Sequence, residues 1–215
     1  MSTVCMTRED LVKLVTRLVV ERLQSGPSIP IGISNRHIHL SRADMDVLFG
    51  KGSELTWKQD LKQPGQYACQ ETVIVRGPKG EFKKVRVLGP LRPETQLEIS
   101  KTDSFTLGVS TPVRESGDVA DSGACKLVGP AGEVELTEGV IAAKRHIHMT
   151  TADAEKYGIT DSQIVSVKIP TEGRALIFGD VVARVSDSYA LAMHLDTDEA
   201  NAAAIPGSCI GEILD

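Results

Sequence analysis

The stretch SNRHIHLSRAD at residues 34–44 is repeated as AKRHIHMTTAD at residues 143–153. Residues of a β-strand alternate between its two faces, so each His-Ile-His places both imidazoles on one face and the isoleucine on the other. Five histidines placed at random in 215 residues would give roughly 0.1 such pairs, and this chain has two, in matching contexts. Because imidazole is a common ligand of transition metals, the repeat predicts a metal site built from two strands.

The composition is that of an ordinary globular protein and argues against several functions. Hydrophobic residues make up 41% and charged residues 25% of the 215 residues, enough chain for one large or two small domains. Aromatic residues are scarce at 4% and the net charge is −5, which argues against a nucleic-acid-binding surface. No apolar run approaches the ~20 residues that span a bilayer, so we expect no membrane segment.

The four cysteines, at positions 5, 69, 125 and 209, lie far apart in the sequence. They form no Cys-x-x-Cys pair, which excludes a thiolate zinc finger. No secretory signal is evident, so we expect reduced thiols in a cytoplasmic protein.

Residues 1–24 predict an amphipathic N-terminal helix. The segment opens with a capping-box-like pattern at residues 7–10, and apolar side chains follow at helical spacing, at positions 11, 14, 15, 18, 19 and 23. Acidic residues disfavour a mitochondrial presequence. Two interpretations stay open: a helix docked on the core, and a detachable helix that binds a groove of another protein. The small residues around Pro27 favour the second.

The rest of the chain predicts mainly β-structure with short helices. Strand signals cover residues 29–33, 71–75, 84–87, 164–169 and 180–185, with hairpin loops expected at 77–81 and 129–133. Short strands with closely spaced turns favour small β-barrels over a parallel α/β sheet.

Short helices are expected directly after each histidine motif. Ser41 and Thr150 or Thr151 would be their N-caps, and Gly50 and Gly158 would end them. A further helix is expected from about residue 198 to residue 204.

His146 lies 109 residues after His37, about half the chain. This spacing predicts two similar halves related by a pseudo-twofold axis, with the histidine pairs meeting at the interface, where ligand sites are common. The match outside the motif is poor, so duplication is a hypothesis and separate ancestry stays open.

Several motifs in order resemble those of the PduL-type phosphate acyltransferases. They are SNRHIHL at 34–40, QPGQYA at 63–68, LGPLR at 88–92, RHIHM at 145–149 and HLDTDEANA at 194–202. The resemblance covers about residues 29–205. It implies a two-barrel, dizinc enzyme that converts an acyl-CoA, most typically propanoyl-CoA, and phosphate into acyl phosphate and CoA.

The resemblance also implies roles for individual residues. It assigns two zinc ions per chain, one to His37, His39 and Glu98, and the other to His146, His148 and His194. Arg92 would bind phosphate as the catalytic arginine. The residues that would contact CoA are Ser34, Arg86 and Asn201.

The family's chain path further implies the domain organisation. Residues 25–35 and 144–215 would form a first β-barrel domain, and residues 36–143 a second. Residues 1–24 would be an encapsulation peptide that binds shell or core proteins of a bacterial microcompartment. The enzyme would then lie inside this microcompartment, within the cytoplasm. Whether the chain forms a homo-oligomer stays open.

The residues themselves leave competing interpretations for three of these positions. Arg92 lies between two prolines, and its planar guanidinium suits a phosphate or a developing oxyanion, yet most arginines are solvated surface residues. Glu98 could lie buried beside a histidine pair or be a surface glutamate. His194 could be a ligand or a buried core histidine.

Two aspartates after His194 have alternatives of their own. Asp196 and Asp198 could accept hydrogen bonds from metal ligands or cap the following helix, and for Asp198 we expect the cap.

An acidic protein that binds CoA needs a local basic patch. Lys84 and Arg86 share one strand face, opposite Val85 and Val87, and two more lysines, at positions 79 and 83, lie nearby. An ordinary exposed strand face is the competing interpretation.

The sequence contains no nucleophile-elbow motif, which agrees with direct attack of phosphate on the thioester. Two alternatives to a phosphate acyltransferase stay open. One is a dinuclear metallohydrolase, because paired histidines with a carboxylate can activate water. The other is a non-catalytic metal-binding module of a microcompartment.

Overall fold

The protein is mainly β, as the sequence predicts. The structure is a computed structural model that describes residues 7–24 and 28–214. Its helices are α1 (Arg8–Gln24), α2 (Arg42–Phe49), α3 (Lys101–Leu107), α4 (Thr151–Tyr157) and α5 (Thr197–Ala202). Its strands are β1 (Ser28–Ser34), β2 (His37–His39), β3 (Trp57–Asp60), β4 (Tyr67–Arg76), β5 (Glu81–Gly89), β6 (Gln96–Glu98), β7 (Val113–Arg114), β8 (Gly123–Val128), β9 (Glu133–Ala143), β10 (His146–Met149), β11 (Ile164–Ile169), β12 (Leu176–Val185), β13 (Ala192–Asp196) and β14 (Ile210–Leu214).

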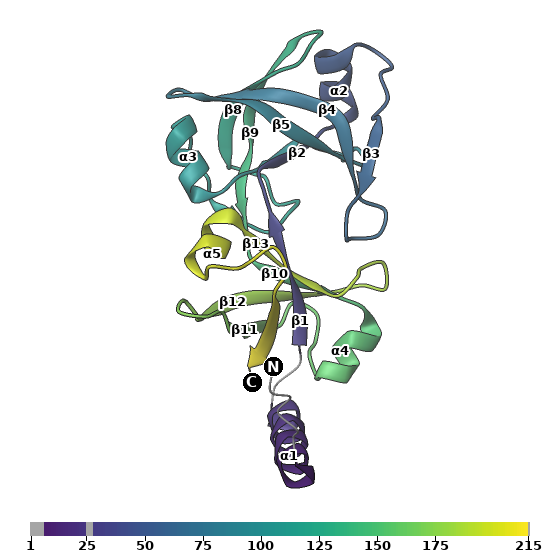
Figure 1. Cartoon of the computed structure of the whole chain (residues 1–215). Helices are drawn as coiled ribbons and strands as arrows, with labels where there is room; N and C mark the ends of the chain where they lie inside the picture. Colours follow the sequence, from purple (N-terminus) through teal and green to yellow (C-terminus); the bar gives the residue numbers. More distant parts are fainter. Residues whose placement is uncertain (1–6, 25–27, 215) are drawn as a thin grey trace, which may run out of the picture.

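The strands close into two six-stranded barrels that lie one above the other (Figure 1). The first barrel runs β1-β13-β10-β12-β11-β14, and β14 pairs back onto β1. The second runs β4-β5-β2-β6-β9-β8, and β8 pairs back onto β4. Two short strands extend the second barrel, β3 beside β4 and β7 beside β9. The two-barrel prediction is therefore confirmed.

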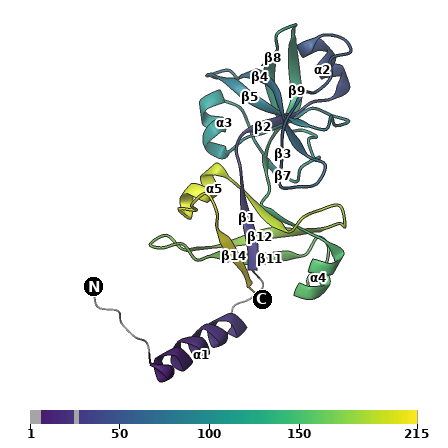
Figure 2. The same ribbon diagram turned by 45° about the vertical axis from the view of Figure 1, so that its right-hand side comes forward.

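The two barrels repeat one topology. Strand β2 is parallel to β5 and antiparallel to β6, and β10 is likewise parallel to β12 and antiparallel to β13. The strand before each histidine motif pairs in the other barrel: β1 is parallel to β13, and β9 is parallel to β6. Each half of the chain thus lends one strand to its counterpart, and the two histidine strands begin where the chain crosses between barrels (Figures 1 and 2).

The alternation within each His-Ile-His motif decides which side chains enter the cores. Ile38 and Ile147 are fully buried in the second and first core, respectively. Burial of such a side chain stabilises the fold by about 1.5–3 kcal/mol. Because successive strand residues point to opposite faces, this burial turns the neighbouring histidines away from the cores and toward the other barrel.

The helices after the histidine motifs begin and end as the sequence predicts. Ser41 is the N-cap of α2 and Gly50 its C-cap, while Thr150 and Gly158 have the same roles in α4. Gly158 has φ +67°, the left-handed conformation that glycine adopts readily.

The helix predicted near residue 198 is present as α5, but the preferred cap and the predicted end are wrong. Asp196 is the N-cap of α5, and the helix runs from residue 197 to residue 202 instead of about 198 to 204. Asp196 has Glu199 three residues later, and the two side chains accept each other's backbone N–H groups in a capping box. Asp198 instead accepts a hydrogen bond from the backbone N–H of Thr102, at 2.8 Å.

Helix α1 lies apart from both barrels in Figures 1 and 2. Asp10 N donates to Thr7 Oγ1 at 3.1 Å and Thr7 N donates to Asp10 Oδ2 at 3.3 Å, which confirms the capping pattern at residues 7–10. Leu11, Val12 and Val15 are each about half exposed. Within the described residues, no helix has the length and apolarity that a membrane crossing requires.

Three of the cysteines, Cys69, Cys125 and Cys209, are free thiols, and Cys5 lies outside the described residues. Burial raises the pKa of Cys69 to about 11 and that of Cys125 to about 12. These two thiols therefore stay protonated at neutral pH.

Candidate metal and anion site between the barrels

The second barrel carries the first group of metal-type ligands. His37 and His39 lie on β2, and Glu98 lies on the neighbouring strand β6 in direct register with His37. His37 Nε2 lies 3.4 Å from Glu98 Oε2, and one donor atom of each of the three residues lies within 4.8 Å of the others. The structure thus brings Glu98 beside the histidine pair.

The first barrel carries a second group with the same geometry. His146 and His148 lie on β10, and His194 lies on β13 in register with His146. The ring centroids lie 4.6 Å apart for His146 and His148, 5.1 Å for His146 and His194, and 5.0 Å for His148 and His194. Glu98 and His194 therefore occupy equivalent places in the two barrels.

The first histidine of each pair has its tautomer set by the backbone. His37 Nδ1 lies 2.8 Å from the carbonyl oxygen of Asn35, and His146 Nδ1 lies 2.8 Å from that of Lys144. A carbonyl oxygen only accepts, so Nδ1 carries the proton and donates. The lone pair of Nε2 is then free for a metal ion, an arrangement common among metal-ligating histidines.

The second histidine of each pair leaves a buried nitrogen without a partner. His39 Nδ1 and His148 Nδ1 have no hydrogen-bond partner within the described part of the chain. A buried polar group without a partner costs roughly 1–3 kcal/mol. A metal ion at each group would satisfy these atoms, so the residues present fit a divalent metal.

The electrostatics of the site favour metal ligation. Burial, followed by the neighbouring histidines, lowers the pKa of His39 and of His148 to about 3, and that of His194 to about 4. Burial alone would raise the pKa of Glu98, but His37, His39 and a hydrogen bond from Ser116 bring it down to about 2. Neutral imidazoles and an ionised carboxylate are the forms that bind a metal.

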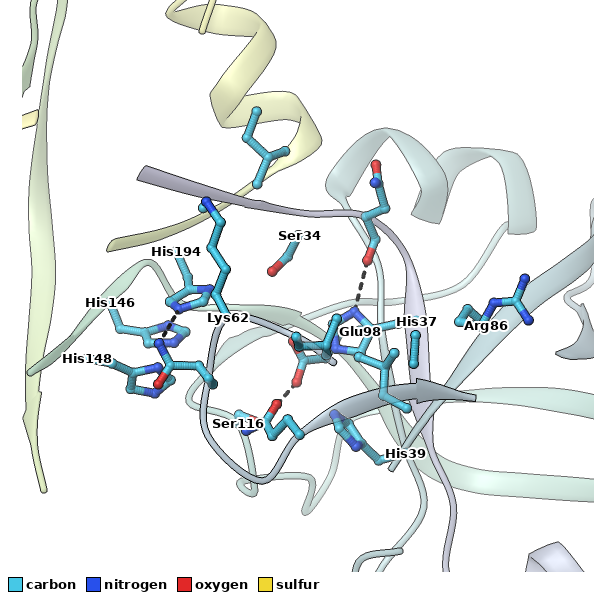
Figure 3. Close-up of a pocket in the computed structure, with 18 of the residues that line it drawn as sticks. Ser34, His37, His39, Lys62, Arg86, Glu98, Ser116, His146, His148 and His194 are labelled. Carbon is cyan, nitrogen blue, oxygen red and sulfur yellow. Dashed lines mark hydrogen bonds and ion pairs between the residues drawn. The ribbon is translucent and has the colours of Figure 1, made fainter. Parts of the chain in front are cut away.

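Both groups face one cavity of about 800 Å³. All six ligand residues line it, together with Ser34, Arg86 and Arg92. Figure 3 shows the three histidines of the first barrel on one side of the cavity and His37, His39 and Glu98 on the other. Of the residues expected in the site, Asn201 does not line this cavity, and it is exposed on α5.

Arg92 is partly buried and is tied to the ligand Glu98. Its backbone N–H donates to Leu40 O at 2.9 Å, and its Nη1 donates to Ser116 Oγ at 2.9 Å. Ser116 in turn donates to Glu98 Oε1 at 2.9 Å. Burial lowers the pKa of Arg92, although Glu98 opposes this effect. The solvated-surface interpretation of Arg92 is therefore wrong.

Of the basic residues expected to bind CoA, only Arg86 lines the cavity. Arg86 lines the cavity, but its Nη1 donates to the carbonyl oxygens of Cys69 and Gln70 at 2.8 and 2.9 Å. Its other guanidinium nitrogens have no hydrogen-bond partner within residues 7–24 and 28–214. Lys58 and Lys62 also line the cavity, and the sequence reasoning did not select them.

The sequence reasoning also missed Gln63, which links the two barrels. Its side-chain nitrogen donates to Ala190 O at 2.8 Å, its side-chain oxygen accepts from Ala190 N at 3.1 Å, and the nitrogen lies 3.3 Å from His194 Nε2. The QPGQYA motif contains Gln63 and was a signal for it. Ser116 lies in no motif, so the sequence carried no signal for it.

Two closed barrels that exchange a strand and share one cavity, lined by two ligand groups that could each hold a metal ion, define a class of two-barrel protein. A family model for phosphate propanoyltransferases matches residues 30–206. The chain belongs to this family of transferase enzymes, and the resemblance found in the sequence is confirmed.

Curated relatives match over nearly their whole length. A phosphate propanoyltransferase of Thermotoga maritima is 54% identical over 189 residues, which cover 88% of this chain and 90% of the relative. The phosphate propanoyltransferase of Clostridioides difficile is 48% identical and covers 96% of this chain and 98% of the relative. That of Salmonella typhimurium is 48% identical and covers 91% and 92%.

Proposed function

We propose that the chain interconverts propanoyl-CoA and phosphate with propanoyl phosphate and CoA, using a zinc ion at each ligand group. The observation that carries the proposal is that both ligand groups and Arg92 line one cavity between the barrels. The relatives are named phosphate propanoyltransferases, which supports these substrates. The sequence alternatives fit less well: family membership makes the chain an enzyme, and the relatives are named transferases, not hydrolases.

Two ligand sets would hold the metal. His37, His39 and Glu98 would bind one zinc ion, and the histidines at positions 146, 148 and 194 would bind the other. When bound, zinc supplies positive charge that orients phosphate and stabilises the departing thiolate.

The chain's own residues position the reactants. The guanidinium of Arg92 would hold phosphate through two parallel hydrogen bonds and offset the charge repulsion as it approaches the thioester. An oxygen of hydrogen phosphate forms a bond to the acyl carbon, and the carbon–sulfur bond breaks. Its electron pair leaves with sulfur, and the proton of hydrogen phosphate ends on the CoA thiol. No enzyme nucleophile is required.

CoA would lie along the wall formed by the second barrel and β1. We assign contacts to Ser34 and Arg86, and the lysines at positions 58 and 62 add positive charge on the same side. Asn201 lies outside the cavity lining, so its proposed contact would involve a part of CoA that extends beyond the cavity.

The reverse reaction distinguishes a transferase from a hydrolase. Purified enzyme given propanoyl phosphate and CoA should form the thioester, which is followed by its ultraviolet absorbance. A metallohydrolase would consume propanoyl phosphate and release propanoate without thioester, and that result would remove the proposal.

Isotope exchange tests direct attack by phosphate. Enzyme, propanoyl-CoA and labelled CoA are incubated without phosphate. Direct attack predicts no label in propanoyl-CoA, because no acyl-enzyme forms. Label incorporation would instead demonstrate an acyl-enzyme and overturn the direct mechanism.

We also propose the organisation implied by the family. Residues 25–35 with 144–215 form one domain, and residues 36–143 form the other. Residues 1–24 bind shell or core proteins of a bacterial microcompartment in the cytoplasm. The half-exposed Leu11, Val12 and Val15 of α1 support this role, because they leave an apolar surface for a partner.

A further inference from the structure

Arg184 lines the cavity and has no part in the two metal-type groups. It lies on β12, in parallel register with His148 of β10. Residues in register on neighbouring strands point to the same face of a sheet. The side chain of Arg184 therefore leaves the first barrel on the same face as His148, toward the second barrel.

The guanidinium of Arg184 has no hydrogen bond or ion pair with any part of the chain that the structure describes, although the residue is only partly exposed. Other arginines of the barrels pair with carboxylates: Arg36 with Asp103, Arg42 with Asp46 and Arg145 with Glu199. A partly buried charge without a partner is costly. An anion in the cavity would remove that cost.

Asp161 is a nearby carboxylate, but it does not neutralise Arg184. Asp161 Oδ1 accepts a hydrogen bond from Val185 N at 2.8 Å, and this bond is the largest cause of its lowered pKa. The positive charge of Arg184 contributes less to this lowered pKa than the hydrogen bonds do, and the two side chains form no ion pair within the described residues. The charge of Arg184 thus remains available to the cavity.

A second positive charge borders the same cavity as Arg184. Arg92 comes from the second barrel and lines the same cavity. After burial, the positive charge of Arg184 further lowers the pKa of Arg92. Two guanidinium groups that repel each other across a shared cavity are stabilised when an anion lies between them.

We propose that Arg184 is a second phosphate-binding arginine, which contacts the anion from the first barrel while Arg92 contacts it from the second. This inference rests on the proposed function and adds a binding residue to it. Hydrogen phosphate has enough acceptor oxygens for two guanidinium groups and still presents one oxygen to the acyl carbon. The site would then be complete only when both barrels are in place.

The position of Arg184 favours free inorganic phosphate as its ligand over the phosphate groups of CoA. Arg184 shares its face with His148, within the metal-type group of the first barrel. The cations assigned to CoA, Lys58, Lys62 and Arg86, all belong to the second barrel or to the loop after β3.

The test compares Arg184→Ala and Arg184→Lys with the unmodified enzyme, using initial rates at varied phosphate and saturating propanoyl-CoA. Arg184→Ala should raise the KM for phosphate about 10- to 100-fold, the effect of losing a charge-assisted hydrogen bond. The KM for propanoyl-CoA, the metal content and the melting temperature should change little. Arg184→Lys should recover part of the loss, because lysine keeps the charge without the planar fork.

A matched control and a binding measurement accompany the kinetics. Arg174→Ala removes the same charge from an exposed position of the first barrel that does not line the cavity, and it should leave the KM for phosphate unchanged. Calorimetry with inorganic phosphate alone, on the metal-loaded protein without CoA, should show weakened binding for Arg184→Ala by a similar factor.

Three results would overturn the assignment while the proposed function stands: an unchanged KM for phosphate in Arg184→Ala, a selective rise in the KM for propanoyl-CoA, or loss of metal or of the folded state. Failure of the unmodified enzyme to form propanoyl phosphate would overturn the proposed function. The phosphate-binding measurement would still decide the role of Arg184 in that case.

Discussion

Among single residues, His39 and His148 give the most direct support for metal binding. They occupy equivalent places in the two barrels, and each has a buried Nδ1 that finds no hydrogen-bond partner among residues 7–24 and 28–214. Burial also keeps both imidazoles neutral, because it lowers each pKa to about 3. The same unsatisfied atom at two equivalent positions is what a pair of metal sites requires.

The ligand groups predict the metal content of the purified protein. We expect close to two zinc ions per chain by elemental analysis. Replacing His37 and His39 together with alanine should remove one ion, and replacing His146 and His148 should remove the other, because each pair belongs to a separate group. A chain that stays fully active after complete removal of metal would refute the metal assignment.

The lowered pKa of His39 predicts how the stability of the metal-free protein depends on pH. The unfolded chain protonates this imidazole below about pH 6.5, whereas the folded chain does so only near pH 3. The free energy of unfolding should therefore fall as the pH falls between these values, by up to about 1.4 kcal/mol per pH unit from this group. Urea denaturation in the presence of a chelator should show a shallower dependence for His39→Gln. Equal slopes would contradict the shifted pKa.

The assignment of Arg92 as the phosphate-binding arginine predicts how much turnover falls when Arg92 is replaced. Arg92→Ala should lower turnover by a factor on the order of 10² to 10³, comparable to the loss of one oxyanion donor. Metal content and folding should not change, because Arg92 is not a ligand, and Arg92→Lys should recover part of the loss. Steady-state kinetics with varied phosphate, together with zinc analysis, check this. Near-normal turnover of the alanine variant would exclude Arg92 from the mechanism.

Local signals explain which elements could be predicted from the sequence. The caps of α2 and α4 and the hairpin loops depend on residues a few positions apart, so the sequence locates them well. The wrong cap of α5 has an equally local cause: Asp196 has a glutamate three residues later and Asp198 does not. Gln63 links the two barrels and Ser116 bonds Arg92 and Glu98 within the second barrel. These contacts join residues far apart in the sequence, so local spacing does not predict them, although a motif drew attention to Gln63.

We predict that helix α1 can be removed without loss of activity. None of the proposed site residues lies in residues 1–24, so deletion of this segment should leave turnover and the melting temperature of the barrels nearly unchanged. The segment fused to a reporter should direct the reporter to a microcompartment, whereas a fusion with Leu11, Val12 and Val15 changed to serine should not. A truncated chain that unfolds would show that α1 belongs to the core.

At the scale of the whole molecule, the exchange of strands between barrels brings the site together. Strand β1 pairs with β13, about 160 residues later, as in Ile31 with Met193. Hydrophobic alternation predicts that such a strand exists but not which barrel it joins, because either barrel buries an alternating strand equally well. The family resemblance implied the crossing of β1, and the pairing of β9 with β6 completes the reciprocal exchange.

The central claim is that the cavity between the barrels transfers an acyl group from CoA to phosphate. The most direct measurement incubates the full-length, metal-loaded enzyme with propanoyl-CoA, with and without phosphate, and quantifies free CoA thiol and propanoyl phosphate together. We predict thiol release only when phosphate is present, with one propanoyl phosphate formed for each thiol. Thiol release without phosphate, accompanied by free propanoate, would contradict the account.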